Sequence, residues 1–125
     1  MIKESKLWQQ VKASLSEYKP KWTQTRIETW SLPGVPDVML CDANGNFHLV
    51  ELKVVTGYAV KLSPHQVSFA QNHAHASVWL LAWKDEEYYL YKAAEIVNVA
   101  EKGLKHIPFI RTKDLFWILH LISPH

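Results

Sequence analysis

The sequence predicts a single α/β domain, residues 1–125, in which helices flank a mixed central sheet. Three observations support this fold class. The chain opens with an amphipathic helical pattern, continues with three strand-like segments, two of which flank an Asn-Gly turn, and then has a capped helix followed by an apolar strand. A helix between two strands is typical of a parallel crossover, so we expect a core of order αβββαβ.

The composition is that of one folded domain. With 125 residues, 48% apolar and 21% charged, the chain can build a single hydrophobic core. No apolar segment is long enough to span a membrane, and the first residues do not resemble a signal peptide, so we expect a cytoplasmic protein. The single cysteine cannot form an internal disulfide, and seven histidines without cysteine pairs make a zinc site an unfavourable interpretation. A net charge of +2 does not by itself indicate a polyanionic partner.

The first helix is expected over residues 3–17. Its apolar side chains recur at three- and four-residue steps and form one stripe, which comprises Leu7, Trp8, Val11, Leu15 and Tyr18. Glu4 falls in the middle of this stripe. Two interpretations remain open for Glu4, namely a first-turn acid favoured by the helix dipole or a carboxylate directed at a functional site.

Three strands should follow. Residues 23–30 alternate and are rich in β-branched side chains, and residues 31–36 form a loop. Residues 35–41 and 47–55 flank the turn Asp42–Asn46, whose central Asn-Gly favours a hairpin. Pairing about this turn places Met39 or Leu40 opposite Leu49 or Glu51, and brings Asp37 within a residue or two of Lys53.

Charged residues in this hairpin form the candidate site. The strand over residues 47–55 is apolar on both faces, as in a strand covered on both sides, so Glu51 and Lys53 are costly there unless they are paired or bind a ligand. A carboxylate pair of Asp37 and Glu51 can hold a hard divalent cation such as Mg²⁺. Lys53, two residues after Glu51, lies on the same face of the strand. The alternative is a solvated face of an edge strand.

The second half of the chain supplies the crossover and an extension. A loop over residues 56–62 precedes a helix in which Ser63 is the N-cap, Pro64 the first residue and Gln66 the partner in a capping box; this helix ends near His75. Further elements are expected as strands over 77–83 and 88–91, a charged turn over 84–87, and helices over 93–101 and 112–122. The last helix is apolar nearly all round, which indicates either dimerisation or a helix folded over an open sheet face.

These motifs resemble the PD-(D/E)xK nuclease superfamily, in particular small VRR-NUC-type domains and phage or archaeal Holliday-junction resolvases. The residues that carry the resemblance are Glu4, Gly34-Val35-Pro36-Asp37, Glu51-Leu52-Lys53 and Leu62-Ser63-Pro64-His65-Gln66. The match as a whole runs from about Glu4 to Trp83. The resemblance implies a restriction-endonuclease-like fold with a core over about residues 3–92. It gives no role to the C-terminal extension over residues 93–125, which includes the extra helix.

The resemblance also implies a mechanism and a set of site residues. Asp37, Glu51 and the Leu52 backbone carbonyl would bind Mg²⁺ or Mn²⁺, with Glu4 as a further ligand directly or through water. Lys53 would act on the attacking water and offset charge on the phosphate, and Gln66 would contact water or the phosphate. The expected function is hydrolysis of DNA, selective for branched or replication-intermediate structures, by a bacterial or phage protein.

Further contacts with DNA are expected around this site. Candidate phosphate ligands are Lys21, Arg26, Lys61 and His65, each of which is otherwise an ordinary surface residue. Trp22 and Trp30 could stack on bases, although core packing is the favoured interpretation. A homodimer would suit symmetric cutting of two strands. The alternative function is a catalytically silent DNA-binding module or nuclease-complex subunit on the same fold.

Overall fold

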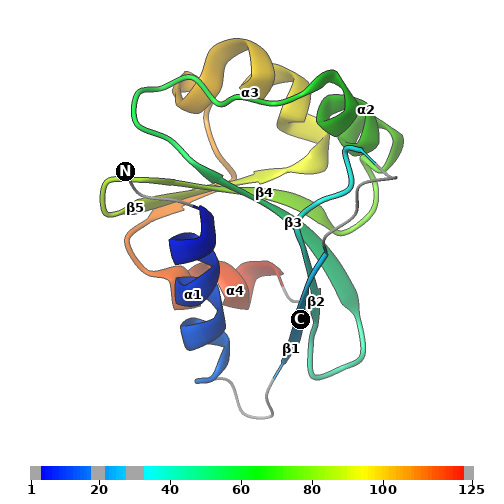
Figure 1. The fold of residues 1–125 in the computed structure, drawn as a ribbon, viewed down its shortest axis with the longest axis vertical. Helices are drawn as coiled ribbons and strands as arrows, with labels where there is room; N and C mark the ends of the chain where they lie inside the picture. Colours follow the sequence, from blue (N-terminus) through cyan, green and yellow to red (C-terminus); the bar gives the residue numbers. More distant parts are fainter. Residues whose placement is uncertain (1–3, 18–21, 28–32, 123–125) are drawn as a thin grey trace.

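The fold is a six-stranded mixed sheet with two helices on each face (Figure 1). It was obtained as a computed structural model and describes residues 4–17, 22–27 and 33–122. The strands lie in the order in which they occur in the chain: β1 (Thr23–Arg26), β2 (Val38–Cys41), β3 (Phe47–Val54), β4 (Val78–Lys84), β5 (Glu87–Lys92) and β6 (Ile110–Thr112). Only β3 and β4 are parallel, because the helical crossover lies between them.

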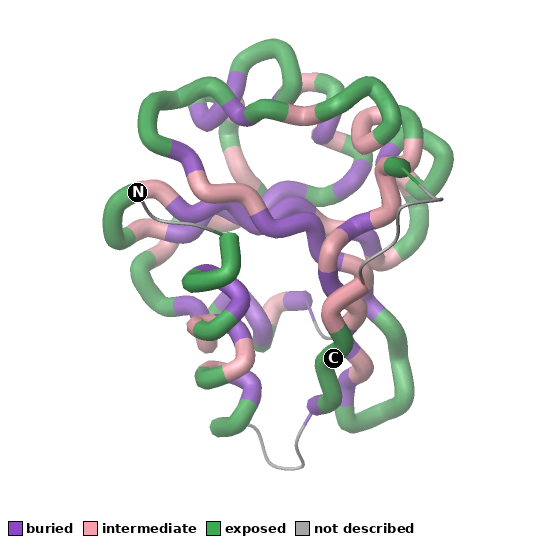
Figure 2. Tube along the Cα trace, viewed as in Figure 1, coloured by how far each residue is buried: buried purple, intermediate pink, exposed green. Residues whose placement is uncertain are grey.

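The helices form an outer layer on each side of the sheet. They are α1 (Glu4–Leu15), α2 (Pro64–Asn72), α3 (Ile96–Lys102) and α4 (Leu115–Ile122), with short 3₁₀ turns at Ala93–Glu95 and Gly103–Lys105. Figure 1 shows α1 and α4 on one face of the sheet, and α2 and α3 on the other. Each face has its own buried apolar cluster, and the central strands are buried on both sides (Figure 2). This two-sided burial explains why β3 and β4 are apolar throughout.

The register of the β2–β3 hairpin confirms one of the predicted alternatives, with Met39 opposite Leu49. The turn is organised by Asp42, which is 5% exposed and whose Oδ1 accepts hydrogen bonds from the backbone N–H groups of Asn44 at 2.9 Å and Asn46 at 3.0 Å. Its Oδ2 lies 2.9 Å from Nε2 of buried His48, whose Nδ1 lies 2.5 Å from Oγ of Ser77. Burial opposes ionisation of Asp42, but these hydrogen bonds outweigh it and lower the pKa of Asp42. The network therefore fastens the hairpin to the start of β4.

The core order α-β-β-β-α-β is as predicted, whereas several element ends and one strand are not. The first strand was expected to reach Trp30, but β1 ends at Arg26, and residues 28–32 lie outside the described residues. Strand β6 was not predicted, and the last helix begins at Leu115 rather than Thr112. Thr112 pairs with Tyr88 of β5, and its Oγ1 accepts a hydrogen bond from the Asp114 N–H at 3.0 Å. A three-residue edge strand with one apolar side chain has too little pattern to be recognised.

Helix α4 folds over the open sheet face, one of the two alternatives predicted for it. Its buried stripe of Leu115, Ile118, Leu119 and Ile122 joins the apolar cluster that α1 also enters. Trp117 points away from this stripe, is 47% exposed and stacks on His120 with 5.4 Å between ring centroids. Among the described residues, no helix has the length and hydropathy needed to cross a membrane.

Candidate active site

The hairpin brings Asp37 and Glu51 together across two neighbouring strands. The ladder between β2 and β3 ends at the pair Val38 and Val50, so Asp37 lies across from Glu51 when the register is continued by one residue. Asp37 is fixed on both sides: its carbonyl accepts a hydrogen bond from the Ile27 N–H at 2.6 Å, and its Oδ2 accepts one from the Leu52 N–H at 3.2 Å. The predicted neighbourhood of Asp37 and the Glu-x-Lys segment is therefore present.

Pro36 leaves the Leu52 carbonyl without a hydrogen bond from the neighbouring segment. In a strand, the N–H and C=O groups of one residue point to the same side, so the Leu52 carbonyl is directed toward β2, as its N–H is. The residue across from Leu52 in the continued register is Pro36, which has no N–H to donate to that carbonyl. The Leu52 oxygen is thus directed toward β2 without a ladder bond from Pro36.

Glu51 has an unusual electrostatic environment. It is 8% exposed, and burial raises the pKa of its carboxyl to about 9, with a hydrogen bond and charge repulsion from Asp37 adding to the effect and Glu4 contributing more weakly. Nζ of Lys53 lies 4.0 Å from Oε2 of Glu51 and opposes this rise. A buried carboxyl group beside a second carboxyl group forms a site where a divalent cation can take the place of the proton on Glu51.

The donor set fits a hard divalent cation. Two carboxylates and one backbone carbonyl provide oxygen ligands, and Mg²⁺ commonly binds one or two carboxylates while keeping several waters. Within residues 4–17, 22–27 and 33–122, no three His, Cys, Asp or Glu side chains gather as a metal-binding group. Glu4 is exposed at the start of α1, and its charge contributes to the raised pKa of Glu51; its expected role as a ligand, directly or through water, stays a prediction.

Lys53, Glu4 and Lys61 line one hollow beside the carboxyl pair. It has a volume of about 220 Å³ and also includes Thr56 and Ala59 from the loop that follows β3. Lys53, near the carboxyl end of β3, and Lys61, in the loop that follows, therefore line the same hollow as Glu4. A phosphate in this hollow would meet two ammonium groups at one wall.

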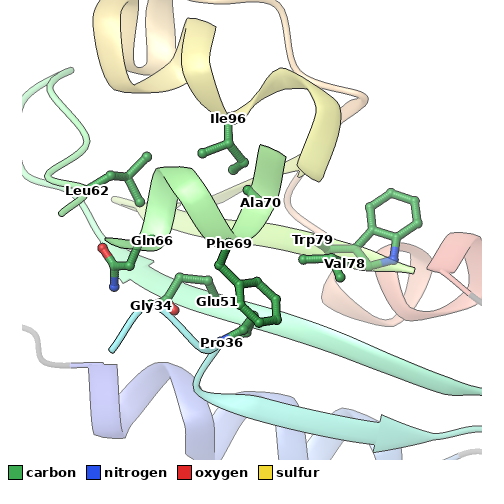
Figure 3. A pocket seen from close by; sticks show the side chains of 10 residues that line it. All are labelled: Gly34, Pro36, Glu51, Leu62, Gln66, Phe69, Ala70, Val78, Trp79 and Ile96. Carbon is green, nitrogen blue, oxygen red and sulfur yellow. The ribbon is translucent and has the colours of Figure 1, made fainter. Parts of the chain in front are cut away.

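Gln66 takes part both in helix capping and in the wall of the site. Its Oε1 accepts a hydrogen bond from the Ser63 N–H at 2.9 Å, while the Gln66 N–H donates to Oγ of Ser63 at 3.1 Å, which completes the predicted capping box. The same side chain lines a pocket with Glu51, Gly34 and Phe69 (Figure 3). Because Oε1 is used by the cap, the amide nitrogen is the group that Gln66 can offer to the site.

Gly34 explains why the two loop motifs meet. Its φ is +90°, and a Cβ placed on it would lie 2.3 Å from the backbone oxygen of His65. The loop that leads to Asp37 thus packs with its backbone against the first turn of α2. This contact brings the Gly-Val-Pro-Asp segment and Gln66 to one pocket.

The remaining predicted contacts have different positions. Arg26 pairs with Val38 on the edge strand β1, which places it near Asp37. His65 is exposed in the first turn of α2. Trp22 is 6% exposed and stacks on His48, so it is a core residue, whereas Lys21 and Trp30 lie outside the described residues.

Comparisons with known proteins find similarity to solved structures. No family model matches the chain, and no curated protein matches its sequence. The Holliday junction resolvase Hjc of the archaeal hyperthermophile Archaeoglobus fulgidus is similar in structure, with a TM-score of 0.51 and 14% sequence identity over 73% of this chain and 74% of the resolvase. The two chains share a fold. The predicted fold class is therefore confirmed, and the similarity extends over most of both chains.

Proposed function

We propose that this chain is a divalent-metal-dependent DNA endonuclease of the PD-(D/E)xK superfamily, acting on branched DNA such as a Holliday junction. The observation that carries the proposal is the buried Glu51 carboxyl against the Asp37 carboxyl, with Lys53 beside it. The shared fold with a Holliday junction resolvase supports the choice of substrate. The VRR-NUC type and a phage or bacterial cytoplasmic origin stay predictions from the sequence.

The residues divide the chemistry between them. Asp37, Glu51 and the Leu52 carbonyl would hold Mg²⁺ or Mn²⁺, which supplies Lewis acidity toward the phosphate and an acidified water. Lys53 is close enough to Glu51 to orient that water and to stabilise negative charge that develops on the phosphate. Lys61 and Arg26 would hold neighbouring phosphates, and the Gln66 amide nitrogen would donate a hydrogen bond at the scissile group.

Replacing Lys53 with methionine should reduce cleavage by about 100-fold or more, because the ammonium group stabilises charge that appears only in the transition state. The measurement is cleavage of labelled four-way junction, flap and duplex DNA with Mg²⁺ or Mn²⁺. Lys12→Met is the matched control, because Lys12 lies in the last turn of α1 over the Trp8 ring, at the opposite end of the helix from Glu4.

The competing function, a silent DNA-binding subunit, makes a different prediction. In that case wild-type protein binds junction DNA, cuts none of the substrates with either metal, and binds equally well after Asp37→Ala. Cleavage by the wild type that is lost in Asp37→Ala and Lys53→Met supports the enzyme. Folded wild-type protein without turnover on any substrate would overturn it.

We also propose that the chain forms a homodimer through the outer face of α4. Trp117 is a large exposed side chain on a helix whose inner stripe is already used in the core. We expect Trp117→Ser to shift the mass measured by analytical ultracentrifugation from dimer to monomer. Val97→Ser on α3, also an exposed apolar residue, is the control that should leave the mass unchanged. A monomeric wild type, with and without junction DNA, would contradict the dimer.

A further inference from the structure

A second concentration of aromatic and basic side chains lies beyond the hollow at Lys53. Tyr58, in the loop after β3, is 54% exposed, and Nζ of Lys84 lies 3.7 Å from its ring centroid, with Nζ of Lys105 at 5.8 Å. Lys102 and Lys105 line an open hollow of about 510 Å³ together with Tyr58. We call Tyr58, Lys84, Lys102 and Lys105 the Tyr58 surface. Glu101 is an acidic side chain in the same hollow, but Lys102 and Lys105 outnumber it there, and Lys84 adds a third ammonium group over the Tyr58 ring.

The Tyr58 surface is held by a direct backbone contact between two distant segments. The Leu104 N–H donates a hydrogen bond of 2.7 Å to the Tyr58 carbonyl. Gly103 has φ of +62°, and a Cβ there would lie 2.1 Å from that same oxygen, so the approach requires glycine. The turn after α3 is therefore docked against the Tyr58 loop. A surface ordered before binding loses less conformational entropy when a ligand arrives.

The surface is continuous with the candidate active site. Ala59 lines both the hollow that contains Tyr58 and the hollow that contains Lys53 and Lys61. The connecting residues belong to the loop between β3 and α2, which Figure 1 shows passing beside α3 at the upper left. A chain that enters at Lys53 can thus reach Tyr58 past Lys61. The extension over residues 93–125, which had no role in the predicted mechanism, contributes Lys102 and Lys105 to this path.

We propose that the Tyr58 surface binds a single-stranded segment of the DNA that extends from the scissile phosphate. An exposed aromatic ring stacks on a base only when that base is not stacked inside a duplex, whereas lysines bind the backbone of any strand. One unpaired base would lie against Tyr58, and adjacent phosphates would contact Lys84, Lys102 and Lys105. This inference rests on the proposed nuclease function and refines its substrate to branched DNA with unpaired nucleotides next to the cut.

Binding without turnover tests the surface independently of catalysis. Fluorescence anisotropy of labelled oligothymidylate in EDTA should show affinity reduced by about 10-fold in Tyr58→Ala, with Tyr58→Phe close to wild type because the ring is kept. In the Lys102→Ala/Lys105→Ala double variant, the slope of log affinity against log salt should fall in magnitude by about 1.4. Phe47→Ala, which removes a ring that is 61% exposed at the other end of β3, is the matched control and should bind as wild type does.

The outcomes separate this inference from the nuclease proposal. Loss of binding in the Tyr58 and lysine variants supports the surface even if no substrate is cut. Wild-type affinity in both variants, or an equal loss in Phe47→Ala, overturns the surface while leaving cleavage by the wild type unaffected. Equal wild-type affinity for polyglutamate and oligothymidylate would also overturn it, because the site would then recognise negative charge alone. Thermal unfolding of each variant checks that the fold is retained.

Discussion

Replacing Glu51 with glutamine is expected to make the protein more stable and, at the same time, inactive. Burial and the neighbouring Asp37 carboxyl raise the pKa of Glu51 to about 9 in the folded protein, from 4.5 for an ordinary glutamate. A neutral amide of nearly the same shape avoids the cost of a buried carboxylate beside Asp37. Under the proposed function it also removes a carboxylate that would bind the metal, so cleavage should fall by about 100-fold or more.

The direction of the pH dependence follows from this raised pKa. A carboxyl whose pKa is higher in the folded state contributes stability that is complete below the unfolded pKa and is lost as pH rises to the folded pKa. Glutamine cannot lose a proton, so the free energy of unfolding of Glu51→Gln should exceed that of the wild type by an amount that grows from about pH 5 to about pH 9. At pH 7 the difference should reach up to about 3 kcal/mol.

Urea denaturation in EDTA across this pH range measures the difference. Glu87→Gln is an instructive control, because a hydrogen bond from Arg111 lowers the pKa of the partly exposed Glu87. The ionised Glu87 carboxylate stabilises the fold above the unfolded pKa of glutamate, and this stabilisation is lost in acid. Glu87→Gln should therefore be less stable than the wild type at neutral pH, and its free energy of unfolding should not rise above that of the wild type between pH 5 and pH 9. A Glu51→Gln variant that is less stable than the wild type at pH 8 would contradict the environment described for Glu51.

The hairpin and its charged residues were predictable because the information is local. The Asn44-Gly45 turn fixes which residues of β2 and β3 can face each other, and a period of two then places Glu51 and Lys53 on one side. The buried pairing of Asp42 with His48 was not predicted, since the residues of a polar turn do not show that Ser77, which precedes β4, will bond to His48. The composition of a turn indicates where the chain reverses direction, but it does not identify the distant segment that will contact the turn.

Contacts between distant segments were the part that the sequence could not show. The Tyr58 surface exists because the turn after α3 packs on the loop after β3. Neither segment has a sequence pattern from which its contact with the other could be predicted. Strand β6, in the C-terminal extension over residues 93–125, was also not predicted, because it forms only by pairing with β5. Candidate site positions near the hairpin could therefore be found from spacing, whereas the Tyr58 surface, which is assembled across the fold, required the structure.

In the loop that carries Asp37, Gly34→Ala adds a single methyl group but should strongly lower the free energy of unfolding. A methyl group there meets the backbone oxygen of His65 at 2.3 Å, and the φ of +90° is unfavourable for any residue with a side chain. Neither the helix turn nor the loop can move without disturbing the Ser63–Gln66 capping box or Asp37. We expect a loss of about 3 kcal/mol or more in the free energy of unfolding.

Gly45→Ala separates the contact from the backbone strain. Gly45 has nearly the same positive φ, +83°, but no atom lies within 4 Å of the position its Cβ would take. Its alanine variant should therefore lose only the conformational cost, about 1–2 kcal/mol. Thermal and urea denaturation of both variants give the difference, and metal-dependent cleavage at a temperature where Gly34→Ala is still folded tests the loop itself. Because the contact positions both Asp37 and Gln66, cleavage by folded Gly34→Ala should be impaired while that by Gly45→Ala is retained. If the two variants lose equal stability and both cut normally, the packing of the Gly34 loop on α2 is not what positions the site.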